Sequence, residues 1–274
     1  MSESIEALNE SMRAAPGAFG PVKALVDTYL AAGKPGEAEL LLKGQLSANN
    51  SNANLHVLMS RVRLALKDKE GALQSIKSAI ASQPQASVGY YALGHWHLQE
   101  RDTSAALEAI DAGLTKLPDN SDLRILRATA LEAAGNVDDA IAEYERLIAR
   151  QPGLLLVANN LASLLADHRE DKASLDRASE LASMLRKSGI PQFKDTVGWV
   201  NLRKGDHRSA IPLLEEAAET MPAHSLIRYH LGVAYLKAGD PDKAREQLKK
   251  ATDLEPETSS VRSKALQALK QVAG

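Results

Sequence analysis

The sequence predicts an all-α protein built from helix–turn–helix repeats that stack in one direction, and two recurring features carry this prediction. Prolines stand at positions 84, 118 and 152, each 34 residues after the last, and the prolines at 222 and 256 keep the same interval. Between these marks apolar residues recur at helical spacing, as in "AIAEYERLIA" (140–149). Self-similarity at a fixed interval of this length is typical of helical solenoids.

The residues that recur with this period suit a helix–turn–helix repeat. Alanine lets one helix approach its neighbour closely, and glycine after a helix supplies the left-handed conformation that ends it. Proline suits the connection into the next helix but not a helix interior. The recurring alanines are Ala38, Ala72, Ala106, Ala140, Ala210 and Ala244, and the turn positions hold Gly33, Gly135, Gly205 and Gly239, with Lys67 and Arg101 as exceptions.

We expect a single solenoid over residues 1–274, with seven repeats between residues 19 and 258. The fifth repeat is irregular, because about four extra residues around "DHREDKAS" (167–174) separate its helices and the following connection is shorter. This segment is either a solvated charged loop or a partner contact or local kink. The predicted repeats are 19–52, 53–86, 87–120, 121–154, 155–190, 191–224 and 225–258.

The two ends of the array differ. Residues 259–274 are expected to form a capping helix, since arginine, lysine and glutamine give it the polar outer face that a solenoid end needs. Residues 1–18 fit the second helix of a repeat that has no first helix before it. They are either a native N-terminal cap or the partial repeat of a fragment cut from a longer array, and we favour the fragment.

The last full repeat, "RYHLGVAYLKAGDPDKAREQLKKATDLEP" (228–256), resembles the tetratricopeptide repeat (TPR) family, whose pattern is W-x2-L-G-x2-Y, A-x3-F-x2-A and a closing proline. Arg228 replaces the tryptophan of that pattern. The resemblance extends over nearly the whole chain and implies a right-handed α-solenoid. The matching residues are Leu231, Gly232, Tyr235, Ala244, Leu248, Ala251 and Pro256.

Composition and motifs argue against catalysis. The chain has no cysteine, and it lacks a G-x-S-x-G elbow, a phosphate-binding glycine loop and an H-E-x-x-H pair. We therefore expect no enzyme activity, no cofactor and no metal site. His95 and His97, in "GHWHLQE" (94–100), lie about 200° apart around a helix, so they cannot grip one ion together.

Charge and hydropathy limit the partners. The net charge of -2 gives no reason to expect nucleic acid. The most apolar stretch, "GLLLVANNLASLLA" (153–166), is too short to enter a bilayer as a spanning helix. No signal peptide is predicted from the N-terminal residues. The compartment is therefore unknown: periplasmic if the chain is a fragment of a longer exported protein, and otherwise cytoplasmic.

In TPR proteins the first helices line a concave groove that holds ligands, so the resemblance implies groove candidates at equivalent first-helix positions. Their side chains suit peptide recognition, because arginine and lysine bind carboxylates, asparagine pairs with peptide backbone and aromatic rings stack. Trp199 is expected either in this groove or in the core. The candidates are Arg61, Tyr91, His95, Asn159, Asp195, Trp199, Arg203, Tyr229 and Lys237.

The resemblance implies a non-catalytic protein–protein interaction scaffold that binds a peptide or partner protein of unknown identity in this groove. Residues from "ANNLASLLADHREDKASLDRASELA" (158–182) onward also resemble the C-terminal repeats of exported bacterial TPR proteins associated with exopolysaccharide and exosortase (PEP-CTERM) systems. That narrower resemblance implies the alternative, a structural component of such an export system that acts by stacking or by self-association through the solenoid ends.

Overall fold

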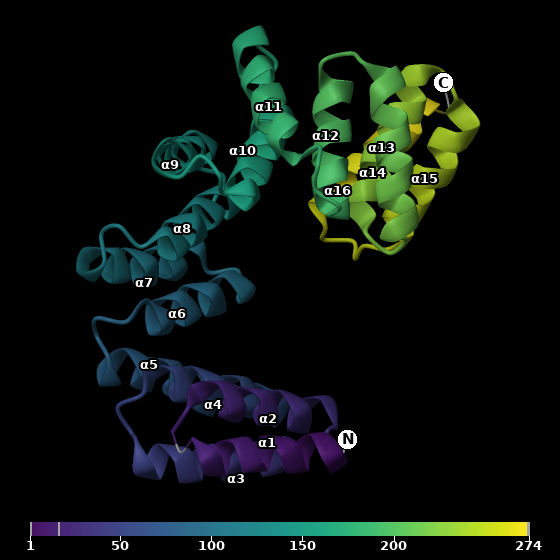
Figure 1. The fold of residues 1–274 in the computed structure, drawn as a ribbon. Coiled ribbons are helices and arrows are strands. Elements are labelled where there is room, and N and C mark those ends of the chain that lie inside the picture. Colours follow the sequence, from purple (N-terminus) through teal and green to yellow (C-terminus); the bar gives the residue numbers. More distant parts are fainter. Residues whose placement is uncertain (1, 16, 273–274) are drawn as a thin grey trace. The chain divides into compact units, whose positions relative to one another are not determined.

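The computed structural model describes residues 2–15 and 17–272, which form helices joined by short turns and contain no strand (Figure 1). The chain divides into two compact units, residues 1–143 (unit 1) and residues 144–274 (unit 2). The helices are α1 (Ser2–Ala14), α2 (Phe19–Ala31), α3 (Pro35–Ala48), α4 (Ala53–Ala65), α5 (Lys69–Ser82), α6 (Ser87–Gln99), α7 (Thr103–Lys116), α8 (Ser121–Ala133), α9 (Val137–Arg150), α10 (Leu155–His168), α11 (Lys172–Leu185), α12 (Pro191–Arg203), α13 (His207–Thr220), α14 (Ser225–Ala238), α15 (Pro241–Asp253) and α16 (Ser260–Val272).

Consecutive helices pair by local signals that recur in the sequence. Several second helices of a pair begin after an aspartate whose carboxylate accepts a hydrogen bond from the backbone N–H three residues later. This bond satisfies one of the N–H groups left free at a helix start. The aspartates that cap in this way are Asp68, Asp102, Asp171, Asp206 and Asp240, at distances of 2.8 to 3.1 Å.

The pair α10–α11 differs from the expected irregularity. The helices start at residues 155 and 172, 17 residues apart, whereas α4 and α5 start at residues 53 and 69, 16 apart. The expectation of about four extra residues between the helices, followed by a shorter connection, is therefore wrong. Helix α10 continues to His168, and Arg169 follows in an extended conformation at φ −124° and ψ 145°. The next connection is longer, with α12 starting 19 residues after α11, at residue 191.

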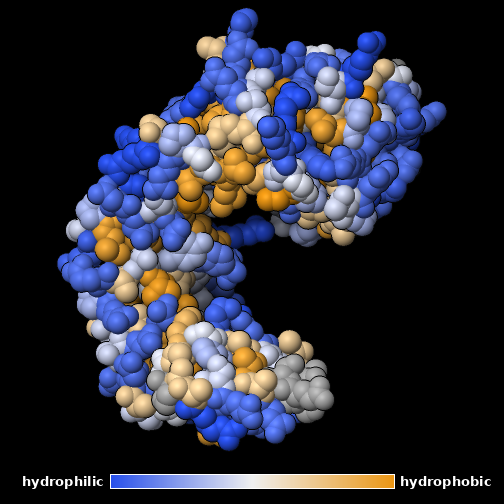
Figure 2. Space-filling model, in the orientation of Figure 1, coloured by the Kyte–Doolittle hydropathy of each residue, from blue (hydrophilic) through white to orange (hydrophobic). Residues whose placement is uncertain are grey.

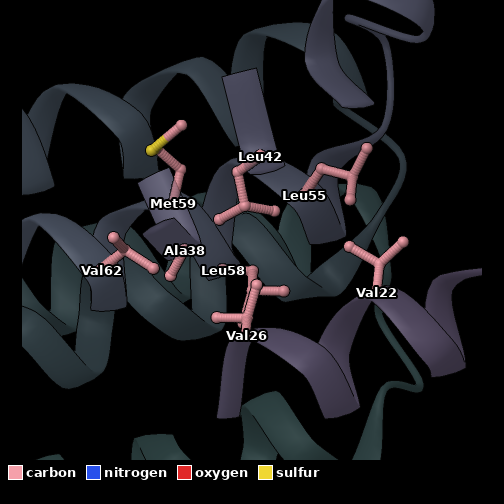
Figure 3. Close-up of a cluster of buried hydrophobic side chains, with 8 residues drawn as sticks. All are labelled: Val22, Val26, Ala38, Leu42, Leu55, Leu58, Met59 and Val62. Atoms are coloured by element: carbon pink, nitrogen blue, oxygen red, sulfur yellow. The ribbon is translucent and has the colours of Figure 1, made fainter. Parts of the chain in front are cut away.

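Apolar side chains from successive helices form the core of unit 1. In one cluster, Val22 and Val26 of α2 meet Ala38 and Leu42 of α3 and a row of residues on α4 (Figure 3). A second cluster joins Tyr90 of α6 to the neighbouring helices. The α4 residues of the first cluster are Leu55, Leu58, Met59 and Val62, and the second cluster also holds Ala106, Ile110, Leu123, Leu126 and Ala130.

Unit 2 repeats this packing. Helices α12 to α16 lie side by side, each in contact with the next along the chain (Figure 1). On α16, Ala265 and Ala268 are buried and join Leu248 and Ala251 of α15 in one cluster. The exposed residues of α16 are mainly polar, although Leu266 is 43% exposed. The exposed polar residues are Ser260, Ser263, Lys264, Gln267, Lys270 and Gln271.

The visible surface of the protein is mainly hydrophilic, with hydrophobic residues gathered in smaller patches (Figure 2). Among the described residues, no helix combines the length and the apolar character that crossing a membrane requires.

Glycine permits a very close approach between the two helices of some pairs. A Cβ atom added at Gly232 of α14 would stand 2.6 Å from Cγ of Leu248 on α15. An added Cβ at Gly94 would meet Ile110 at the same distance, and one at Gly198 would meet Leu214 at 2.8 Å. These separations are too short for real carbon contacts, so any side chain here pushes the paired helices apart.

The turn inside a pair uses a left-handed residue at most positions. Gly33, Gly135, Gly205 and Gly239 have φ between 68° and 85°. Lys67 and Arg101 adopt the same conformation, at φ 63° and 60°. A side chain with a Cβ atom is disfavoured in this region, so these two positions carry backbone strain.

We expect Gly232→Ala to lower the free energy of unfolding by about 1–2 kcal/mol, because the methyl group forces α14 away from α15. Gly44→Ala is the matched control, since Gly44 lies exposed within α3 with no atom within 4 Å of an added Cβ. That change is expected to raise stability by about 0.5–1 kcal/mol through helix propensity. Urea unfolding followed by circular dichroism measures both. Equal effects of the two substitutions would contradict the close-approach interpretation.

We expect Arg101→Gly to stabilise the protein by about 0.5–1 kcal/mol, because glycine adopts the left-handed conformation without a steric cost. Gly239→Ala, at an equivalent turn, is expected to cost a similar amount. Thermal unfolding of both variants checks the pair of signs. A loss of stability in Arg101→Gly would show that its side chain outweighs the strain.

Candidate functional site

The predicted groove residues divide between the two compact units. In unit 1, Arg61 Nη2 lies 2.9 Å from Asp27 Oδ1, and Lys23 Nζ donates to Asp27 Oδ2 at 2.6 Å. Burial raises the pKa of Asp27, but the hydrogen bonds from Lys23 and Arg61 outweigh burial and leave that pKa below its usual value. Arg61 therefore already forms an ion pair with Asp27, and a ligand would have to share its charge with that carboxylate.

Tyr91 and His95 are neighbours on α6 of unit 1. Their ring centroids are 6.4 Å apart with an interplanar angle of 14°. Tyr91 is 40% exposed and His95 is also exposed, so both rings are open to solvent. They form an accessible aromatic surface.

In unit 2 four of the six candidates line a hollow of about 610 Å³. Trp199 and Arg203 of α12 line it together with Tyr229 and Lys237 of α14. Its volume lies within the range of about 300–1,000 Å³ that is common for ligand pockets. We call this feature the unit 2 hollow. Its lining also includes Asp167, which shares a predicted groove row with Arg203 and Lys237. Glu170, His207 and Lys264 line it too and were not predicted.

No predicted row points to Lys264. The rows advance by 34 residues, and the residue 34 positions after Tyr229 of α14 is Ser263, whereas Lys264 of α16 stands 34 positions after His230. Only the packing of α16 in the structure shows that Lys264 lines the hollow.

Trp199 is both buried and part of the hollow. Its side chain is 4% exposed, and its indole N–H donates to Asp167 Oδ1 at 2.8 Å. The guanidinium carbon of Arg203, one helical turn later, lies 5.9 Å from the centroid of the indole. A cation at this distance from an aromatic face is attracted by the electron density of the ring. The indole is therefore fixed at one edge and contacted by a cation.

Asp195, expected in the groove, is instead buried at 6% exposure, and it does not line the hollow. Both of its carboxylate oxygens lie 3.0 Å from Nδ1 of His230, which is 1% exposed. The imidazole ring stacks on Trp199, with centroids 4.1 Å apart and an interplanar angle of 14°. Because the carboxylate accepts, Nδ1 of His230 is the donor. The Asp195–His230 pair therefore supports the tryptophan of the hollow.

Tyr229 presents a protonated phenol to the hollow. Burial and the nearby negative charge of Asp167 raise the pKa of Tyr229, and Arg203 offsets this only in part. Its ring centroid lies 6.1 Å from that of Trp199. The hydroxyl therefore remains a hydrogen-bond donor at neutral pH.

Arg203 and Asn159 differ in how far their polar groups are satisfied. Arg203 Nη2 donates to the backbone oxygen of Arg169 at 3.3 Å and lies 3.7 Å from Glu170 Oε1. Asn159 of α10 donates from Nδ2 to Asn160 Oδ1 at 3.3 Å, and its own Oδ1 is buried with no partner among the described residues. Asn159 does not line the unit 2 hollow.

The chain is similar to tetratricopeptide repeat proteins. A tetratricopeptide repeat profile matches residues 3–93 and 201–272, more than half of the chain, and a second profile of the same description matches residues 91–154. Two TPR repeat-containing proteins of Pseudomonas aeruginosa are similar to the chain. One is 27% identical over 162 residues, 59% of this chain and 27% of the relative, and the other is 33% identical over 121 residues, 44% of this chain and 46% of the relative.

A more distant relative aligns with more of the chain. The DnaJ homolog subfamily C member 3 of Mus musculus is 21% identical over 245 residues, which is 89% of this chain and 44% of that protein. The chain thus spans less than half the length of each of these three relatives.

Solved structures share the fold. A chain in the crystal structure of the APC/C hetero-tetramer Cut9–Hcn1 aligns with 98% of this chain over 52% of its own length, with a TM-score of 0.73 at 12% identity. PilF of Pseudomonas aeruginosa matches 80% of this chain and 95% of its own with a TM-score of 0.60 at 15% identity. The predicted all-α solenoid of helix–turn–helix repeats is confirmed.

We expect Asp195→Ala to lower the free energy of unfolding by about 1–3 kcal/mol, because the buried imidazole N–H of His230 then has no acceptor. Asp195→Asn is the matched control, since its amide oxygen still accepts. The chain has two tryptophans, Trp96 and Trp199, so a Trp96→Phe background isolates the emission of Trp199. Urea unfolding gives the energies, and a red shift of that emission reports release of the stacked ring. An unchanged spectrum in Asp195→Ala contradicts the supporting role.

Proposed function

Because the chain belongs to the tetratricopeptide repeat family, we propose that it is a non-catalytic scaffold that binds a peptide or partner protein at the unit 2 hollow. TPR proteins generally mediate protein–protein interactions, and their fold is typically non-catalytic. The proposal assigns the binding to Trp199, Arg203, Tyr229 and Lys237.

The observation that carries the proposal is the combination of side chains in this hollow. Two aromatic rings, Trp199 and Tyr229, stand beside the cations Arg203 and Lys237. Tryptophan, tyrosine and arginine are the residue types that contribute most to the energy of protein interfaces. Tyr229, Arg203 and Lys237 are open to solvent, whereas Trp199 is 4% exposed and packs against Tyr229.

The support behind the rings favours a preformed site. Trp199 is held at its N–H by Asp167 and on its face by His230, which Asp195 holds in turn. A ring fixed by its own packing does not have to be ordered when a partner arrives. Trp199 therefore needs no rearrangement before a partner binds.

An extended peptide is the form of partner that the lining suits. Most of the lining belongs to α10, α12, α14 and α16, which are successive first helices, and Leu175 of α11 and His207 of α13 also contribute to it. Neighbouring residues of an extended peptide therefore meet neighbouring first helices. Tyr229 has a free O–H that can donate to a peptide carbonyl.

Assembly by stacking or self-association, within an exopolysaccharide or other export system, has less support as the alternative function. The outer face of α16 carries Gln267 and Lys270, which are costly to bury against another copy. Leu266 is the exposed apolar residue on that face. We therefore rank the groove function first.

Selection of a phage-displayed peptide library on the whole chain tests the proposal. We expect peptides to be enriched, and we expect the double variant Arg203→Glu/Tyr229→Ala to bind the resynthesised peptides at least about tenfold more weakly, a loss of about 1.4 kcal/mol. Isothermal titration calorimetry measures the affinities.

The matched controls are Arg208→Glu, which changes an exposed arginine outside the hollow, and Tyr229→Phe, which keeps the ring. Circular dichroism establishes that each variant is folded. Failure to enrich any peptide, or equal binding by the folded double variant, refutes the proposed site.

A further inference from the structure

Helix α3 of unit 1 carries the most exposed large apolar side chain among the described residues. Leu40 is 70% exposed, whereas Ala38 and Leu42, two residues to either side, are fully buried in the core cluster with α2 and α4 (Figure 3). Residues two apart on a helix point about 200° away from each other. Leu40 therefore stands on the face of α3 that is turned away from its own core.

Two glycines flank Leu40 on this face. Gly36 and Gly44 lie one helical turn before and after it, both are exposed, and a Cβ atom added at either would meet no atom within 4 Å. They differ in this from Gly94 and Gly232, where the missing Cβ admits a side chain of the paired helix. Glycine within a helix is less stable than alanine, and no contact inside the described chain offsets that loss at Gly44.

The matching positions of other second helices hold different residue types. Leu40 stands two residues after the recurring alanine Ala38, and Gly44 stands six residues after it. The residues that match Leu40 are Gln74, Glu108, Ala142, Pro212 and Glu246, and those that match Gly44 are Ser78, Ala112, Arg146, Glu216 and Lys250. An exposed leucine between glycines is thus a feature of α3 and not of the repeat.

The charges on this face are arranged symmetrically about Leu40. Glu37 lies three residues before it and Lys43 three residues after it, and both are exposed. When two copies of α3 cross antiparallel at Leu40, Glu37 of each copy stands at the level of Lys43 of the other. A parallel crossing brings like charges together instead, which is unfavourable. We call Gly36, Glu37, Leu40, Lys43 and Gly44 the α3 face.

We propose that the α3 face binds the α3 face of a second copy of this chain, as an antiparallel helix pair with two-fold symmetry. Such an interface must complement itself, and the order of charges about Leu40 does so. Leu40 of each copy packs between the glycines of the other, where the absence of Cβ atoms lets the backbones approach closely. Lys43 Nζ lies 3.0 Å from Oε1 of Glu39 in its own helix, but its side chain is 58% exposed and has room to pair with Glu37 of the second copy.

The contact is small, so the dimer is weak and reversible. One pair of helices buries less surface than the roughly 1,200–2,000 Å² that specific, stable complexes bury. Exposed ion pairs add little affinity but set the orientation. Because α3 belongs to unit 1 and takes no part in the unit 2 hollow, the association is independent of the peptide-binding function and of stacking at the end formed by α16.

Sedimentation velocity of the whole chain from about 1 μM to about 1 mM tests the association. We expect a monomer at the lowest concentration and an increasing fraction of dimer above it. Leu40→Gln, which introduces the residue type found at the matching position 74, is expected to weaken dimerisation by at least about tenfold. Leu266→Gln, at an exposed leucine of α16, is the matched control and is expected to leave dimerisation unchanged.

Gly44→Ala separates association from folding. Its methyl group favours the helix in the monomer but occupies the space into which Leu40 of the second copy packs. We expect the variant to unfold at a higher urea concentration when it is monomeric, and to dimerise about tenfold more weakly. A change that merely damaged the fold could not give this combination.

Charge reversal tests the antiparallel orientation. Glu37→Lys and Lys43→Glu are each expected to weaken dimerisation by about three- to tenfold, because each brings like charges to the same level of the helix pair. The double variant Glu37→Lys/Lys43→Glu is expected to recover it, since opposite charges face each other again. Circular dichroism establishes that every variant is folded.

The outcomes decide the proposal. A chain that stays monomeric up to the highest concentration overturns it, and so does a dimer that Leu40→Gln and Gly44→Ala leave intact. Loss of the dimer in Leu266→Gln instead assigns the association to the solenoid end at α16. Failure of the double charge variant to recover overturns the antiparallel contact.

Discussion

The close contact between the two helices of a pair is the constraint on which the rest of the structure depends. At Gly94, Gly198 and Gly232 the space where a side chain belongs is occupied by a large apolar residue of the partner helix. Buried alanines on the second helices, such as Ala106 and Ala244, allow the same short distance between the paired helices. Because each pair is held in this way, equivalent positions of successive first helices recur in register, and a row of side chains becomes a surface.

The unit 2 hollow shows how such a surface acquires a preferred chemistry. Trp199 supplies apolar area, but its indole N–H and its face are both engaged, by Asp167 and His230. His230 in turn is held by Asp195. Buried polar groups are costly unless paired, so this chain of contacts is more than packing: it fixes one orientation of the ring. Lys237 and Lys264, which also line the hollow, make no hydrogen bond or ion pair with a described side chain.

Local signals explain both the accuracy and the errors of prediction from sequence. Proline, glycine and aspartate act within a few residues, so the turns and helix starts follow from them. The connection between α10 and α11 has no left-handed residue, and α10 simply extends to His168 before Arg169 adopts an extended conformation. A helix can lengthen by one residue without a signal in the sequence. The many charged residues of "DHREDKAS" indicated a longer loop than the one that the structure contains.

The sequence by itself determined the repeat, its helices and the positions that share a row, because these depend on short-range periodicity. Only the tertiary structure decided what each position in a row does. Tyr91 and Asp195 both stand four residues after the start of a first helix, yet Tyr91 is 40% exposed and Asp195 is 6% exposed. Burial is set by the neighbouring helix, which brings His230 against Asp195. Helical periodicity fixes where a side chain stands on its own helix, and contacts between helices fix whether solvent reaches it.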